Sequence, residues 1–141
     1  MSTFSPNVRK LIYKIRINYE PLGNGRHREV YLLPSKKFIV KIPINIDGAL
    51  ANIAEYKYWK NREVIKEHYN VDLARCRLYQ GSAFQDKLLV MEFIKDKFDN
   101  EKYLPSWAFK IDCSQVGRNR QGKIVAYDYG SQEWDYGGQD W

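Results

Sequence analysis

The sequence predicts an α+β fold, because two hydrophobic periodicities alternate along the chain in a particular order. A helical period gives way to a run of short strands, a second helical segment follows, and the remainder returns to strands. Consecutive short strands joined by turns favour an antiparallel sheet over a doubly wound one. The 141 residues are 44% hydrophobic and 15% aromatic, a composition typical of one globular domain.

The first elements are an amphipathic helix and three strands. Ser5 and Pro6 are typical of a helix start, and apolar residues then recur at helical spacing as far as Ile15. The turn residues Gly23-Asn24-Gly25 and Pro34 divide the next segment, which predicts an antiparallel meander of three strands, 17–22, 29–33 and 38–42.

The second half of the predicted fold contains one main helix, two strands and a hairpin. Asp47 is the expected N-cap of a helix from about residue 49 to about residue 69, with its buried face formed by Leu50, Ile53, Ala54, Tyr58 and Ile65. Strands are expected at 75–79 and 87–94, followed by a charged connector at 95–102. A C-terminal β-hairpin is expected from strands 114–118 and 123–127. The sheet would therefore contain about five strands.

The composition of the chain indicates its cellular compartment and its domain boundaries. No apolar run approaches the ~20 residues that span a bilayer, so no membrane partner is expected. The two cysteines, Cys76 and Cys113, cannot form a disulfide framework, which favours the cytoplasm. We assign residues 1–130 to a single domain, and we expect the acidic, aromatic residues 131–141 to be a poorly ordered tail or an interaction peg.

Four features that carry chemistry follow one another in this framework. Gly23-x-Gly25-x-x-Arg28-x-Val30 has the spacing of a glycine loop between two strands, with Arg28 where a third glycine would stand. Lys41 lies inside an apolar strand, and Glu55 lies in the following helix, where it can pair with that lysine. Asp128-Tyr129-Gly130 follows the apolar end of the hairpin.

Together these features resemble the protein-kinase-like fold over roughly residues 17–130. The resemblance implies a kinase small lobe in which Lys41, fixed by Glu55, holds the phosphates of ATP and Asp128 holds Mg²⁺. It also implies that the segment Val90–Ile94, through Glu92 and Phe93, binds adenine with backbone groups. The implied nucleotide-binding residues are Gly23, Gly25, Val30, Lys41, Glu55, Glu92 and Phe93.

The catalytic loop departs from the family pattern. In active kinases a metal-binding asparagine precedes the motif aspartate by about thirteen residues, and a catalytic aspartate lies about five residues earlier. Here those positions are Gln115 and Lys110. Glutamine retains an amide oxygen for Mg²⁺, but a charged lysine cannot accept a proton. Asp112 is the candidate base if the loop is shortened.

Length is the second departure, since 141 residues leave little room for the large lobe that holds a protein substrate. The preferred interpretation is therefore a reduced, pseudokinase-like protein that binds and modulates a partner protein, with or without ATP, through contacts such as Trp134, Tyr136 and Trp141. Such economy would suit a virus and would place the chain in the host cytoplasm. The alternative is a minimal ATP-dependent phosphotransferase.

A third interpretation is nucleic-acid binding by a basic, aromatic patch on the hairpin. Arg118, Arg120 and Lys123 would contact the phosphates, with Tyr127 and Tyr129 nearby for stacking. A solvated hairpin tip explains the same residues. Histidine and cysteine show no ligand spacing, so no structural zinc site is expected.

Overall fold

The computed structural model describes residues 3–97 and 115–134, and it confirms the α+β class. The helices are α1 (Pro6–Asn18), α2 (Ile46–Lys60) and α3 (Arg62–Tyr69). The strands are β1 (Glu20–Asn24), β2 (Arg28–Leu32), β3 (Phe38–Pro43), β4 (Cys76–Gln80), β5 (Lys87–Glu92), β6 (Asp96–Lys97), β7 (Val116–Arg118) and β8 (Ile124–Ala126).

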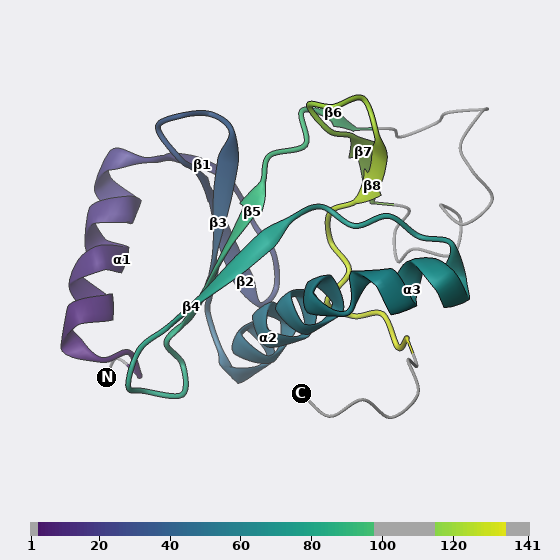
Figure 1. Ribbon diagram of the computed structural model, residues 1–141. Coiled ribbons are helices and arrows are strands. Elements are labelled where there is room, and N and C mark those ends of the chain that lie inside the picture. The colour runs from purple at the N-terminus through teal and green to yellow at the C-terminus, as the bar shows by residue number, and fades with distance from the viewer. Residues whose placement is uncertain (1–2, 98–114, 135–141) are drawn as a thin grey trace.

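A five-stranded sheet forms the body of the molecule, in the order β1-β2-β3-β5-β4 with every neighbouring pair antiparallel. The predicted meander is its first half, and α2 and α3 connect β3 to β4 (Figure 1). This arrangement is consistent with the small lobe that the kinase resemblance implies. A smaller sheet, β6-β7-β8, contains the predicted hairpin and stands beside the large one (Figure 1).

Both faces of the large sheet are covered in the described part of the chain. On one face, Ile12 and Ile15 of α1 pack against Val40, Ile42 and Leu88. On the other face lies α2, and the core there, which α3 and the β7–β8 hairpin extend, includes Ile39, Tyr58, Ile65, Leu89, Met91, Val125 and Tyr129. Strand alternation explains the division, because successive residues of β3 point to opposite faces.

The predicted main helix is wrong in three respects. The helix is interrupted at Asn61, which ends α2 and precedes α3, and its N-cap is Asn45, whose Oδ1 accepts a hydrogen bond from the Gly48 amide at 3.0 Å. Its buried face is Ala49, Asn52, Glu55 and Tyr58, whereas Leu50 is 48% exposed. Two polar residues belong to this face because they have partners on the sheet, which a count of apolar residues cannot detect.

Two short pieces of structure were not predicted. β6 contains only two residues and pairs with β7, where Gly117 lies so close that a Cβ would be 2.5 Å from the Asp96 carbonyl oxygen. After β8 the chain returns to α2: the Tyr58 hydroxyl donates a hydrogen bond to the Gln132 carbonyl, and the rings of Tyr58 and Trp134 meet edge to face at 4.9 Å. Trp134 is therefore partly buried and is not an exposed tail residue.

No helix in the described ranges, 3–97 and 115–134, is both long enough and apolar enough to cross a membrane.

Candidate functional site

The site begins with a lysine that the fold has buried. Lys41 is on the α2-facing side of β3, and its side chain is only 5% exposed. Its Nζ donates to Glu55 Oε1 at 2.7 Å and to the Tyr127 carbonyl oxygen at 2.9 Å. The predicted pairing of Lys41 with Glu55 is thus present, and the ammonium group is fixed by two elements besides its own strand.

Glu55 is the common acceptor of the site. Besides Lys41, its carboxylate accepts hydrogen bonds from both Arg28 Nη atoms, at 2.9 and 3.1 Å, and from the amides of Tyr129 at 3.2 Å and Gly130 at 2.8 Å. Burial acts to raise the pKa of Glu55, but the charges of Lys41 and Arg28 outweigh it and lower that pKa to about 2. Glu55 is therefore an ionised carboxylate with no exposed side-chain surface.

Arg28 joins Glu55 to Asp128. Its Nη2 donates to Asp128 Oδ1 at 2.8 Å, and its Nη1 also donates to Asn52 Oδ1 at 3.0 Å. Asn52 in turn donates to the carbonyl oxygens of Lys41 at 3.0 Å and Lys87 at 2.6 Å, so α2 is anchored to β3 and β5. Four charged groups, Arg28, Lys41, Glu55 and Asp128, therefore form one connected cluster.

The segment Asp128–Gly130 is held rigidly against α2. Tyr129 is fully buried, and its hydroxyl donates to the Ala74 carbonyl oxygen at 2.8 Å. A Cβ on Gly130 would lie 2.9 Å from the Ala51 carbonyl oxygen, so glycine allows the chain to pass this close to the helix. Burial raises the pKa of Asp128, although the charges of Lys41 and Arg28 oppose that shift. The cluster therefore presents a carboxylate, 40% exposed, beside a buried lysine.

A pocket of about 310 Å³ opens in front of this cluster. The glycine turn of β1–β2 lines one side, the end of β5 and the following residues line another, and the residues just before β7 and just after β8 complete it. Predicted site residues that line it are Gly23, Gly25, Val30, Lys41, Glu92, Phe93, Gln115 and Asp128. The fold thus brings together residues that lie more than a hundred positions apart in the sequence.

Other predicted site residues have different surroundings. Glu55 lies behind the pocket wall and reaches it through Lys41. The Gly25 amide is already bonded to the Arg28 carbonyl oxygen at 2.8 Å, so it is not free to meet a ligand. The Glu92 carboxylate turns to β4 and accepts a hydrogen bond from the Arg75 amide at 3.0 Å. Asp112 lies outside the described residues.

Sequence reasoning missed Arg28, which it treated only as a lost glycine. The signal was the alternation of side chains along the strand. Val30 is opposite Lys41 in the antiparallel register, so Arg28, two residues away on the same strand, is on the same face as that lysine. A charged residue on the covered face of a strand requires a partner. Further lining residues, among them Leu22, Ile39 and Lys97, were also missed.

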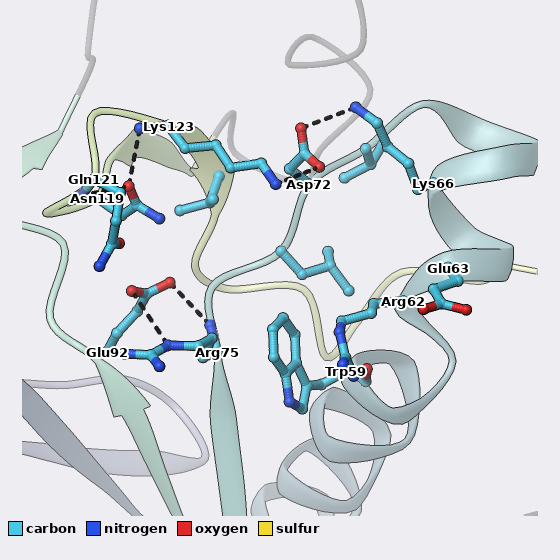
Figure 2. A pocket seen from close by; sticks show the side chains of 13 residues that line it. Trp59, Arg62, Glu63, Lys66, Asp72, Arg75, Glu92, Asn119, Gln121 and Lys123 are labelled. Carbon is cyan, nitrogen blue, oxygen red and sulfur yellow. Dashed lines mark hydrogen bonds and ion pairs between the residues drawn. The ribbon is translucent and has the colours of Figure 1, made fainter.

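A second pocket, of about 500 Å³, lies between α3, the start of β4 and the β7–β8 turn. Five of its charged side chains pair with one another: Lys66 and Lys123 both contact Asp72, and Arg75 contacts Glu92 (Figure 2).

The predicted nucleic-acid patch is only partly present. Arg118 donates to the Gly122 carbonyl oxygen at 2.8 Å, and Lys123 contacts Asp72 at 3.3 Å. Tyr129 is wrong as a stacking residue because it is fully buried. Tyr127 is covered by Lys97, whose Nζ is 5.0 Å from the ring centroid.

No family model and no curated protein sequence matches the chain. Similar solved structures are those of aminoglycoside phosphotransferases. The GDP and kanamycin complex of APH(2″)-IIia has a TM-score of 0.45 at 13% identity, over 72% of this chain and 36% of that one. The gentamicin complex of APH(2″)-IIa has a TM-score of 0.45 at 19% identity, over 79% and 34% of the two chains.

The streptomycin–ATP complex of APH(2″)-IIa has a TM-score of 0.42 at 17% identity, over 70% of this chain and 31% of that one. The chain therefore spans about a third of the length of each of these structures. At these identities and TM-scores, neither an activity nor a substrate passes from them to this protein.

Proposed function

We propose that the pocket between the β1–β2 turn and the end of β5 binds a nucleoside triphosphate, with ATP as the first candidate. The observation that carries the proposal is Lys41, a buried cation that lines the pocket. Lysine has three N–H donors, and within the described residues two of them are used, by Glu55 and Tyr127. The third donor is available to a phosphate oxygen, in a group already fixed in position.

The rest of the pocket suits the other parts of a nucleotide. Val30, Ile39 and Ile94 supply an apolar surface for a base, and Ile94 lies outside the register of both β5 and β6. Its backbone groups therefore have no sheet partner among residues 3–97 and 115–134 and are candidates to bind the base edge. Lys97 adds a second cation for the phosphates.

Calorimetric titration with ATP, and with adenosine as a ligand without phosphates, tests this proposal. We expect ATP to bind and adenosine to bind more weakly. Lys41→Met should lower the affinity for ATP by about tenfold to a hundredfold, because one charge-assisted hydrogen bond is lost. The matched control is Lys10→Met on the exposed side of α1, which should leave the affinity unchanged. Failure of ATP to bind the wild-type chain, with or without Mg²⁺, would contradict the proposal.

For the role of the bound nucleotide, the modulation of a partner protein is our first candidate. Three apolar residues around the start of α2, Ile44, Ile46 and Leu50, are 48%, 61% and 48% exposed. A partner bound to these residues would contact the helix that carries Glu55. A shift of this helix would change the position of Lys41. Phosphoryl transfer is the second candidate, with Asp112 as its base.

Incubation with labelled ATP separates these two roles. The partner-modulating role predicts no transfer of label by the chain alone. It also predicts that polar substitution of Ile46 and Leu50 weakens capture of a partner while ATP affinity is retained. Transfer that disappears in Asp112→Asn and in Lys41→Met would instead establish the phosphotransferase.

A further inference from the structure

Of the residues that the kinase resemblance assigns to magnesium, Asp128 already has a cationic partner within the chain. The carboxylate of Asp128 already accepts a hydrogen bond from Arg28 at 2.8 Å, and the other assigned residue, Gln115, offers only a neutral amide. Within residues 3–97 and 115–134, no group of three or more His, Cys, Asp and Glu side chains is placed to hold a metal ion. Mg²⁺ on this carboxylate, at about 2.1 Å from an oxygen, would stand close to the guanidinium on the same carboxylate, and the two cations would repel.

The charge of the cluster leads to the same conclusion. Lys41, Glu55 and Asp128 alone would have a net charge of −1, which opposes an incoming phosphate unless a cation is added. Arg28 brings the cluster to neutrality, and its guanidinium is bonded to both carboxylates. Because its side chain is only 13% exposed, solvent screens these interactions weakly.

Arg28 approaches Asp128 from the side of α2, so it does not fill the pocket. It does not line the pocket, and its other partners, Asn52 and Glu55, are on α2. Asp128 is therefore neutralised from the helix side, while the pocket side retains Lys41 and Lys97 for the phosphates.

We infer that Arg28 takes the place of the divalent cation, so that this pocket binds nucleoside di- and triphosphates without Mg²⁺. The inference rests on the proposed nucleotide binding and specifies its metal requirement. The arginine is part of the chain, so the neutralising charge is always present and its position is set by β2.

The test is calorimetric titration of the full chain with ATP and ADP, once in excess EDTA and once in excess MgCl₂. We expect the two conditions to give affinities within about threefold of each other. Asp128→Asn, which removes a negative charge and keeps the shape, should bind ATP in EDTA at least as tightly as wild type. These results would support the inference, and the asparagine variant retains the hydrogen-bond acceptor of the native fold.

Arg28→Ala gives the complementary measurement. With Asp128 no longer neutralised, the affinity in EDTA should fall by more than about tenfold, and MgCl₂ should restore part of it. The matched control is Arg26→Ala, an exposed arginine of the same turn, which should behave as wild type in both conditions. Equal affinities of wild type and Arg28→Ala in EDTA would overturn the inference.

Wild-type binding that is lost in EDTA and restored by MgCl₂ would also overturn the inference, but it would leave the proposed nucleotide binding intact. In that case Asp128→Asn should lose the effect of the metal. Absence of binding in both conditions would instead remove the proposed function, and the inference with it.

Discussion

At the scale of single residues, the molecule depends most on Glu55. This carboxylate accepts hydrogen bonds from β2, from β3 and from the segment after β8. It therefore connects α2 to each of the other elements that contribute to the cluster. Removal of one member of a buried ion cluster leaves the other charges buried without a counter-ion. The resulting loss of stability is larger than the net stabilisation that the intact cluster provides.

Glu55→Gln should therefore lower the free energy of unfolding by about 3–5 kcal/mol at neutral pH. The reason is that Lys41 and Arg28 would keep their charges in a buried site and lose their common counter-ion. Urea denaturation followed by circular dichroism measures the change. The control is Glu67→Gln on the exposed side of α3, for which we expect a change of no more than about 0.5 kcal/mol.

The same carboxylate predicts a dependence of stability on pH. Its pKa is lowered from 4.5 to about 2 by folding, so the unfolded state binds the proton more readily. The stabilisation from Glu55 is thus complete above the unfolded-state pKa and is lost as the pH falls towards about 2. The difference in the free energy of unfolding between wild type and Glu55→Gln should therefore decrease as the pH falls over this interval. A difference that stays constant from neutral pH to pH 2 would contradict the assignment.

At the scale of elements, the position of α2 against the sheet depends on a close backbone approach. A Cβ on Gly48 would lie only 2.1 Å from the His27 carbonyl oxygen, and this oxygen also accepts a hydrogen bond from Ile44 at 2.7 Å. The first turn of α2 therefore sits directly on the residue that precedes Arg28. Helix position and arginine position are set together.

Gly48→Ala should destabilise the protein by about 2 kcal/mol, because steric conflict with a backbone atom exceeds the gain in helix propensity. It should also weaken ATP binding, since the turn that carries Arg28 must move. Thermal unfolding and calorimetry measure the two effects. Gly25→Ala, whose Cβ would lie 3.7 Å from the Arg28 carbonyl oxygen, is the control for stability.

The revised orientation of the second helical region can be tested with two residues that the apolar pattern placed on one face. Ile65 of α3 is fully buried, so Ile65→Ala should cost about 2–4 kcal/mol. Leu50 of α2 is 48% exposed, and Leu50→Ala should change stability by less than about 1 kcal/mol. Similar losses in both variants would favour the single continuous helix face that the sequence predicts.

At the scale of the whole molecule, the chain after β8 closes the structure by returning to α2 and α3. Trp134 contacts the rings of Tyr58, Tyr69 and Tyr129, with centroid distances of 4.9, 6.0 and 6.2 Å. These contacts join the segment that bears Asp128 to the helices. A residue outside the pocket therefore helps to hold the Asp128 segment against the helices.

Trp134→Ala should lower the free energy of unfolding by about 3 kcal/mol, through lost aromatic contacts and a cavity beside Tyr58. Trp134→Phe should recover a large part of the loss, because it retains ring packing. Thermal melts of both variants test this. If Trp134→Ala melts at the wild-type temperature, the contact with α2 does not contribute to stability.

The sequence was sufficient for most of the strands and for much of the pocket lining, because these depend on local patterns. The apolar run of β3 located Lys41 and its pairing with Glu55, and the glycine turn located the β1–β2 hairpin. The buried face of α2 could not be predicted in this way. Asn52 and Glu55 are buried by partners on β2, β3 and the segment after β8, and local periodicity contains no information about such distant partners.

The exposed edge at β1 has a consequence for how the protein behaves in solution. Every residue of β1 is exposed, and an open edge of this kind can recruit a strand from another molecule. Pro21 has no backbone N–H to offer, and the register shift between Pro21 and Gly23 interrupts the ladder. We therefore expect β1 to resist pairing with strands of other molecules, so that the protein does not seed intermolecular sheets at high concentration.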